Sequence, residues 1–362
     1  MGDTATMTEW ARISVMHPFG ARVDVDIGEG STKQLTEDVV QQLGALLKRV
    51  MDEHALVVVT GLLPTAGFTP NIMDKMMDAF GPPEANITFG NTPLVDGEEL
   101  VTGTSSSMPD HPAIRVLGNT RDKNGEPTAL LANVGYVFHQ DASEPYDCTS
   151  FLYCEKAPSK GAETLYAKCS TLYSRLSDED KAFIETAVGV WSNRGTAGGP
   201  AALDSALGAR MNATGTRRIR DSYRRHDGWN EAEQRRTLVA VDPFTGEKIL
   251  SGCQPMGFDY FEGMDPNESK DKLESIMNSA YGPIIIGKLN DDLETVTETV
   301  WPDDVVMKVR WQPGWGCLWD NRRTTHSRTP IQIYADDGER RMWQLIRHRE
   351  MKEGYVLQLQ EA

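Results

Sequence analysis

A histidine and an aspartate one residue apart, His139 and Asp141, form a pair whose residue types and spacing could bind a metal ion. Three further histidines follow, His226, His326 and His348. Two neutral imidazoles and one carboxylate on one face of an octahedron are a ligand set typical of non-haem Fe(II), and they leave three positions for small molecules. The pair therefore points to redox chemistry at a single metal ion, if a downstream histidine completes the set.

The spacing of His139 and Asp141 is weak evidence by itself. The chain has 7 histidines and 53 acidic residues among 362 positions, so about one such pair is expected by chance. A second pair, His348 and Glu350, does exist, but no histidine follows it. Only the first pair can take its third ligand from further along the chain.

A second motif ends at His326. Trp315 to His326 reads WGCLWDNRRTTH, and Arg341, 15 positions later, begins the strand-like RMWQLI. An HxD pair, a threonine in a turn, WDNRxxxH and a downstream arginine together resemble the taurine dioxygenase / 2,4-dichlorophenoxyacetate dioxygenase (TauD/TfdA) family. Other segments follow in the family's order, so the resemblance covers most of the chain: HPFGARVDVDI, HALVVVTG, AFGPPE, HPAIRVLGN, FHQDASE, APSKGAETLYA and VDPFTGEKIL.

The resemblance implies an enzyme that uses Fe(II), 2-oxoglutarate and O2, on a mainly β fold with flanking helices and a double-stranded β-helix (jelly-roll, cupin-like) core. Carried over by position, His139, Asp141 and His326 bind the metal, and Thr164 and Arg341 hold 2-oxoglutarate. An arginine suits the distant carboxylate of 2-oxoglutarate, because its planar fork pairs with both oxygens and stays charged. We expect oxidation of an unactivated C–H bond, with hydroxylation as the default and desaturation or ring closure as alternatives.

One position departs from the family members that act on sulfonates. Those members carry a second arginine four positions after the first, where this chain has Leu345. Residues 341, 343 and 345 share a face of a strand, so an inward Arg341 predicts that Trp343 and Leu345 line an apolar substrate pocket, with Asn133 as a further candidate. The expected substrate is a small carboxylate or amino acid with an aliphatic portion. A sulfonate or sulfate ester held by another arginine, such as Arg323 or one from 193–236, is the alternative.

Two interpretations from other classes remain beside this one. A β-sandwich that binds a metabolite without catalysis would not need the metal ligands, and a zinc hydrolase with the same ligands would not need 2-oxoglutarate. Oxygen consumption in the presence of Fe(II) and 2-oxoglutarate separates both from an oxygenase.

Composition excludes several other partners. The net charge of -16 argues against nucleic acid, whose binding depends on Lys and Arg meeting phosphates. The apolar runs are far shorter than the roughly 20 residues that span a bilayer, and the first residues do not resemble a secretory signal. Five cysteines without a CxxC pair suit a reducing compartment. These features predict a cytoplasmic protein with a small-molecule substrate, and they leave assembly into a homo-oligomer open.

The elements that must position the motifs follow from periodicity. Residues 36–54 have apolar positions at helical spacing, with Thr36 as N-cap, and run into a buried strand at 55–60. Further helices are expected at 71–80, 177–190 and 268–281, and strands at 111–118, 149–154, 238–241, 305–311, 316–319 and 341–346. Helices outside short strands indicate a sandwich or open barrel in a single domain, 1–362, with a lid or insertion at 193–236. Asp320, Asn321 and Arg322 are expected to brace the turn before His326.

Overall fold

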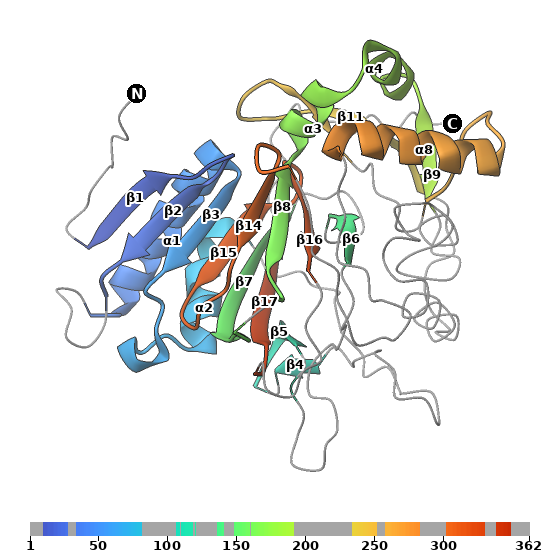
Figure 1. Ribbon diagram of the computed structural model, residues 1–362. Helices are drawn as coiled ribbons and strands as arrows, with labels where there is room; N and C mark the ends of the chain where they lie inside the picture. Colours follow the sequence, from blue (N-terminus) through green and yellow to red (C-terminus); the bar gives the residue numbers. More distant parts are fainter. Residues whose placement is uncertain are drawn as a thin grey trace, which may run out of the picture.

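Two β-sheets facing each other form the centre of the computed structural model (Figure 1). The structure describes residues 10–27, 34–81, 106–108, 110–118, 120, 136–140, 148–159, 161–191, 234–251, 258–282, 302–329 and 338–348.

The larger sheet, called the main sheet, has eight strands. Their order is β1 (Ala11–Val15), β2 (Ala21–Val25), β3 (Leu56–Thr60), β15 (Gly316–Asp320), β7 (Cys148–Lys156), β17 (Arg341–His348), β5 (His111–Gly118) and β4 (Ser106–Met108). Only β2 and β3 pair in parallel, because α1 connects them.

The second sheet has four antiparallel strands in the order β14 (Val306–Val309), β8 (Thr164–Lys168), β16 (Thr324–Arg328) and β6 (Tyr136–His139). Two smaller sheets are formed by β10 (Gln234–Thr237), β9 (Val188–Trp191) and β13 (Phe258–Phe261), and by β11 (Val239–Val241) and β12 (Lys248–Leu250).

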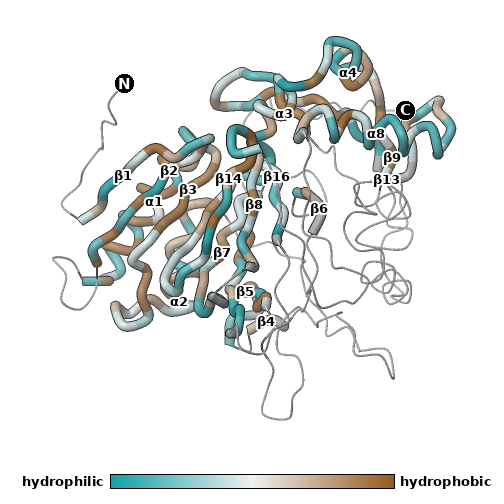
Figure 2. Tube along the Cα trace, in the orientation of Figure 1, coloured by the Kyte–Doolittle hydropathy of each residue, from teal (hydrophilic) through white to brown (hydrophobic). Residues whose placement is uncertain are grey.

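The centre of the main sheet is buried on both faces, as the alternation of side chains along β3 shows. Val57 and Val59 belong to the core that includes the helices α1 (Glu37–His54) and α2 (Pro70–Met77). Leu56 and Val58 belong to the core shared with the second sheet. A strand covered on both sides needs a continuous apolar run, which explains the sequence LVVVT and the hydrophobic colour along β3 in Figure 2. We call the face toward the second sheet the inner face.

The remaining helices cover the outer side of the second sheet. Leu165 of β8 packs in one core with Leu172 of α3 (Cys169–Arg175) and Ile276 of α8 (Pro266–Tyr281). The helix α4 (Asp178–Ile184) begins at the N-cap Ser177, and two 3-10 turns, η1 (Pro64–Ala66) and η2 (Asp78–Phe80), flank α2. None of the helices among the described residues is long and apolar enough to cross a membrane.

Most of the elements expected from periodicity are present. Thr36 caps α1 by accepting a hydrogen bond from the amide of Val39, and the helices expected at 71–80 and 268–281 begin within two residues of prediction. The helix expected at 177–190 is wrong in its second half, where Val188–Trp191 is strand β9. The β-branched VGVW run pairs there with β10 and β13. The predicted insertion at 193–236 lies outside the described residues except for its last three.

Candidate metal centre and anion site

The candidate ligands His139 and His326 are brought together by the second sheet. β6 and β16 are antiparallel neighbours, and His139 and His326 are directly opposite each other in the register. Their ring centroids are 4.2 Å apart. Because metal–nitrogen bonds are about 2 Å long, rings at this separation can ligate one metal ion. Among the described residues no group of three His, Cys, Asp or Glu forms a metal cluster, and Asp141 lies outside them.

Tyr281 contacts both strands that carry the candidate histidine ligands, β6 and β16, on the face of the second sheet away from those ligands. Phe138 and Thr325 each precede a candidate ligand, so they point to the opposite face of the second sheet. The ring of Tyr281, at the end of α8, lies 4.6 Å from that of Phe138. Its hydroxyl is 2.8 Å from Thr325 Oγ1. Helix α8 therefore fixes β6 and β16 relative to each other from outside.

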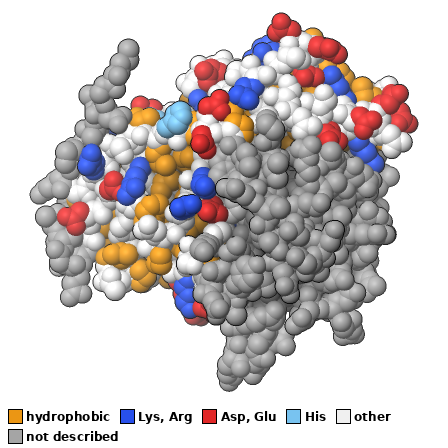
Figure 3. Space-filling model, in the orientation of Figure 1, with side chains coloured by type: hydrophobic (Ala, Val, Ile, Leu, Met, Phe, Trp, Pro, Cys, Tyr) orange, Lys and Arg blue, Asp and Glu red, His pale blue; other side chains and the backbone are white. Residues whose placement is uncertain are grey.

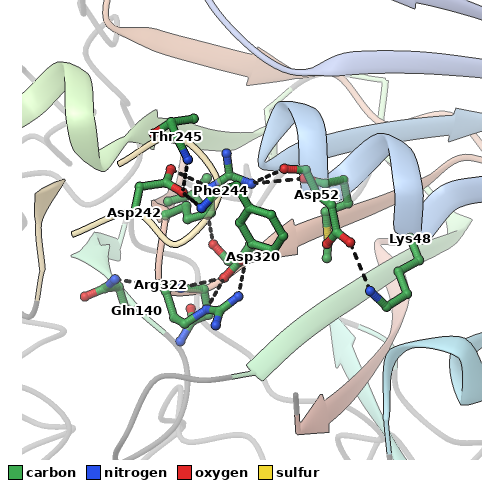
Figure 4. Close-up of polar contacts among 12 residues, drawn as sticks. Lys48, Asp52, Gln140, Asp242, Phe244, Thr245, Asp320 and Arg322 are labelled. Carbon is green, nitrogen blue, oxygen red and sulfur yellow. Dashed lines mark hydrogen bonds and ion pairs between the residues drawn. The ribbon is translucent and has the colours of Figure 1, made fainter. Parts of the chain in front are cut away.

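A hydrogen bond also connects the end of β6 to the turn before β16. Gln140 Nε2 donates to the carbonyl oxygen of Asn321 at 2.6 Å, and Figure 4 shows this bond beside the turn that precedes β16. The middle residue of HQD thus faces away from the metal and binds the WDNR turn. The sequence did not predict this contact, because the HxD motif does not specify its middle residue.

The turn from Asp320 to Arg323 is braced by buried ion pairs, as expected for Asp320 and Arg322. Arg322 donates from Nε and from its terminal nitrogen to the two oxygens of Asp320, at 3.0 and 2.7 Å. Arg323 donates to Asp242 at 2.7 Å and to the carbonyl oxygens of Met51 and Asp52 at the end of α1 (Figure 4). The turn is therefore joined both to helix α1 and to the segment after β11.

Two aromatic side chains, one from each sheet, lie beside the ring of His326. The ring of Trp319 lies 5.0 Å from it and that of Tyr166 lies 6.1 Å from it. Tyr166 is opposite His326 in the register of β8 and β16. Nearby Cys154 and Cys317 form no disulfide, and burial raises the pKa of each thiol to about 12. The side chains beside His326 are thus aromatic, and the buried thiols of the same core stay protonated at neutral pH.

Thr164 is two residues before Tyr166 on β8, so it faces the same interior. Its hydroxyl accepts a hydrogen bond of 2.9 Å from the indole nitrogen of Trp311, and only 3% of the residue is exposed. Arg328 is opposite Thr164 in the register. The indole donor orients the threonine hydroxyl, whose own hydrogen can then point to an acceptor.

A buried cation on the same side is Arg340, which is 3% exposed. It precedes Met342 by two positions, and Met342 belongs to the inner-face core. Burial, and next the like charge of Arg328, lower the pKa of Arg340 to about 9. The guanidinium is therefore still charged at neutral pH but penalised by its surroundings, and a bound anion would remove that penalty.

The expected orientation of Arg341, Trp343 and Leu345 is wrong in this structure. Arg341 Nε and Trp343 Nε1 both donate to Glu155, at 2.7 and 2.6 Å. Trp343 and Leu345 belong to the core under the helices α1 and α2. Met342 and Gln344 of β17 face inward, and Arg340, the residue before the strand, is buried on the same side near Cys154 and Tyr166. The inward set is therefore one position earlier than the motif suggested. Asn133, the other pocket candidate, lies outside the described residues.

Comparison with known proteins identifies the family of the chain. The family model described as "Taurine catabolism dioxygenase TauD, TfdA family" matches residues 15–346. The chain is accordingly a dioxygenase that depends on Fe(II), 2-oxoglutarate and O2. It belongs to the TauD/TfdA family.

Solved structures show the same fold at low sequence identity. A taurine dioxygenase from Burkholderia xenovorans is 18% identical, with 94% of this chain and 90% of that chain covered and a TM-score of 0.55. AAD-2 in complex with Mn(II) and N-oxalylglycine is also 18% identical, with 99% and 100% covered and a TM-score of 0.57. A putative alpha-ketoglutarate-dependent 2,4-D dioxygenase from B. xenovorans is 16% identical, with 93% and 97% covered and a TM-score of 0.53. A search of curated proteins gave no match.

Proposed function

We propose that this dioxygenase oxidises an unactivated C–H bond of a small carboxylate or amino acid with an aliphatic portion, and that His139, Asp141 and His326 hold its Fe(II). The observation that carries the metal site is the in-register pair of imidazoles, 4.2 Å apart. We take the two facing sheets to be the double-stranded β-helix that the family is expected to have. A cytoplasmic location and assembly into a homo-oligomer stay predictions.

For 2-oxoglutarate we propose Arg340, in place of Arg341, together with Thr164. Arg341 already pairs with Glu155, and its side chain is 31% exposed. Arg340 is buried on the inner face near Tyr166 and Arg328, and Thr164 is opposite Arg328. A buried guanidinium can fix the distant carboxylate of 2-oxoglutarate bidentately, and a threonine hydroxyl can add one hydrogen bond.

The chain's own residues would then position the reactants and exclude water. Fe(II), when bound, supplies the centre at which O2 and 2-oxoglutarate react. Trp319 and Tyr166 line the space beside His326, and their aromatic surfaces limit the access of water there. Tyr281 and Gln140 would keep β6 and β16 in register. Tyr281 acts from the outer face of the second sheet, and Gln140 acts at the end of β6.

Arg323, the arginine first considered for binding a sulfonate substrate, does not face the interior between the sheets. Arg323 is fully buried between Asp242 and two helix carbonyls, so it has no reach into the inner face. Family membership also removes the non-catalytic binding protein and the zinc hydrolase as main candidates. An anionic substrate would need another inward cation.

The test of the metal site is the variant His326→Ala, measured by Fe(II) content and by 2-oxoglutarate-dependent succinate release. Loss of one of three protein ligands should abolish both while circular dichroism stays unchanged. His348→Ala removes the histidine of the competing HxE pair and should keep both. Near-normal iron content and turnover in His326→Ala would contradict the assignment.

A further inference from the structure

The loop that joins β11 to β12, residues 242–247, is built around Asp242; we call it the hairpin loop. Asp242 Oδ1 accepts a hydrogen bond of 2.8 Å from the amide of Phe244. The amide of Asp242 donates to the carbonyl oxygen of Glu247, and that of Gly246 donates to the carbonyl oxygen of Asp242. A short loop closed by an aspartate in this way has few backbone conformations, so it holds Phe244 in a defined place.

The ring of Phe244 contacts the guanidinium groups of two consecutive residues in the turn before β16. Its centroid is 4.8 Å from Arg323 Cζ and 5.9 Å from Arg322 Cζ (Figure 4). Both arginines are almost completely buried, and Phe244 is half-buried. The attraction between a cation and an aromatic face is stronger where water is excluded, so this ring can fix both side chains of the turn.

The two arginines pair with carboxylates in different parts of the chain. Arg323 pairs with Asp242 of the hairpin loop, whereas Arg322 pairs with Asp320, which belongs to the turn itself. The ion pair of Arg322 therefore does not connect the turn to another element, but its contact with Phe244 does. The hairpin loop thus holds the turn at two consecutive side chains, one through Asp242 and both through Phe244.

The same turn is connected to both strands that carry candidate metal ligands. It leads directly into β16, where His326 is three residues after Arg323. It also accepts, at the carbonyl oxygen of Asn321, the hydrogen bond from Gln140, the middle residue of the HQD motif at the end of β6. A displacement of the turn would therefore displace ligands on two separate strands relative to each other.

From these contacts we infer that Phe244 is a positioning residue of the metal centre: its ring holds Arg322 and Arg323, and thereby the turn that places His326 and Gln140. A metal ion is sensitive to such placement, because its bonds to protein atoms vary by only about 0.2 Å. The inference rests on the proposed function, since it needs a metal ion bound to His326. It gives a role to the segment VDPFTGEKIL, which supplies none of the proposed ligands.

The test measures Co(II) binding to the full chain under nitrogen. Co(II) accepts the same nitrogen and oxygen ligands as Fe(II), and its visible absorption reports the geometry of the bound ion. Phe244→Leu keeps an apolar side chain but removes the aromatic face. It should weaken Co(II) binding about tenfold, the lower end of the effects seen when residues behind metal ligands are replaced, and it should change the visible spectrum. Phe244→Tyr keeps the ring and should restore the affinity and the spectrum of the wild type.

All titrations are made at a temperature at which circular dichroism shows each variant to be folded, so that a loss of stability does not count as a loss of affinity. If Phe244→Leu does not fold at any temperature, Phe244→Met takes its place. The flexible methionine side chain adapts to irregular spaces but has no aromatic face, so the same weakening of Co(II) binding is expected.

Tyr173→Leu is the matched control, because the ring of Tyr173 also contacts two cations, Lys181 of α4 and Lys248 of β12, at 5.8 and 6.0 Å. Both cations lie outside the turn before β16, so the Co(II) affinity and spectrum should not change. A wild-type affinity and spectrum in Phe244→Leu would overturn the inference even if that variant unfolds more easily, because Phe244 would then only stabilise the fold. Equal weakening in Phe244→Tyr or in Tyr173→Leu would overturn it too.

The variant His326→Ala, titrated with Co(II) in the same way, separates two kinds of failure. If His326→Ala binds Co(II) as the wild type does, the proposed metal site is wrong and this inference falls with it. If His326→Ala loses Co(II) binding and Phe244→Leu keeps it, the metal site stands and the inference alone is wrong.

Discussion

Arg340 and Arg341 are adjacent in sequence but lie in different environments. Arg340 is almost completely buried on the inner face, whereas Arg341 bonds Glu155 beside Trp343. The motif favoured Arg341 as the residue that binds 2-oxoglutarate, and the alternation of side chains could not show which of the two arginines faces inward. Residues 342–347 are all buried, because both faces of β17 are covered. The sequence therefore has no polar face from which the inward side could be predicted. The inward face becomes visible only when β17 is paired with β7.

The two arginines give a direct prediction. Arg340→Gln should raise the KM for 2-oxoglutarate at least about a hundredfold, because breaking a buried ion pair costs roughly 3–5 kcal/mol and each 1.4 kcal/mol is a factor of ten. Arg341→Gln, which breaks a partly exposed pair, should change it less than about threefold. Initial-rate measurements of succinate release decide between them. The reverse pattern would restore Arg341 as the co-substrate residue.

At the scale of elements, helix α8 connects to the metal centre through Tyr281. Tyr281→Phe keeps the ring on Phe138 and loses the hydrogen bond to Thr325, so the free energy of unfolding should fall by about 0.5–1.5 kcal/mol. Tyr281→Ala loses both contacts and should also weaken Fe(II) binding about tenfold, the lower end of effects seen when residues behind metal ligands are changed.

Tyr173→Phe is the control for Tyr281, because the Tyr173 hydroxyl bonds Glu185 at an exposed position. Denaturant unfolding and metal titration should show almost no change for it. If Tyr281→Ala binds Fe(II) as tightly as the wild type, α8 does not position the histidine strands.

The buried pair of Arg323 and Asp242 makes a second prediction about elements. Arg323 joins the turn before β16 to the end of α1 and to the segment after β11. Arg323→Met leaves the fully buried Asp242 carboxylate without this partner, so unfolding should be easier by about 3–5 kcal/mol. Lys48→Met breaks the partly exposed pair with Asp52 on α1 and should cost less than about 1 kcal/mol. Equal stability losses in denaturant would show that Arg323 is not the stronger connection.

The sequence predicted the elements with strong local signals better than their pairing. The apolar stripe and N-cap of α1, the LVVVT run of β3 and the histidine at the end of WDNRxxxH were all recognisable. β9 was missed because VGVW continues a helix-like stretch, and its strand form depends on partners at Gln234–Thr237 and Phe258–Phe261. Likewise Gln140 and Tyr281 act through partners more than 40 positions away, which no local pattern reveals.

For the whole molecule, charge and surface agree with a small-molecule enzyme. On the face shown in Figure 3, acidic and basic side chains are interspersed over the described part, and they form no continuous basic surface there. With a net charge of -16, an anionic substrate gains little from long-range attraction. It must be held by local cations between the two sheets, as we propose for Arg340 and the anionic co-substrate 2-oxoglutarate.

The central claim is that the chain is a 2-oxoglutarate-dependent dioxygenase whose centre lies between the two sheets. The most direct measurement is O2 consumption together with succinate release by the full chain, with Fe(II), ascorbate and 2-oxoglutarate each present or omitted. We predict slow turnover without any added substrate, equal amounts of O2 consumed and succinate formed, and no turnover when Fe(II) or 2-oxoglutarate is omitted or when His326 is replaced by alanine. Product formation without 2-oxoglutarate, or turnover under nitrogen, would contradict the account.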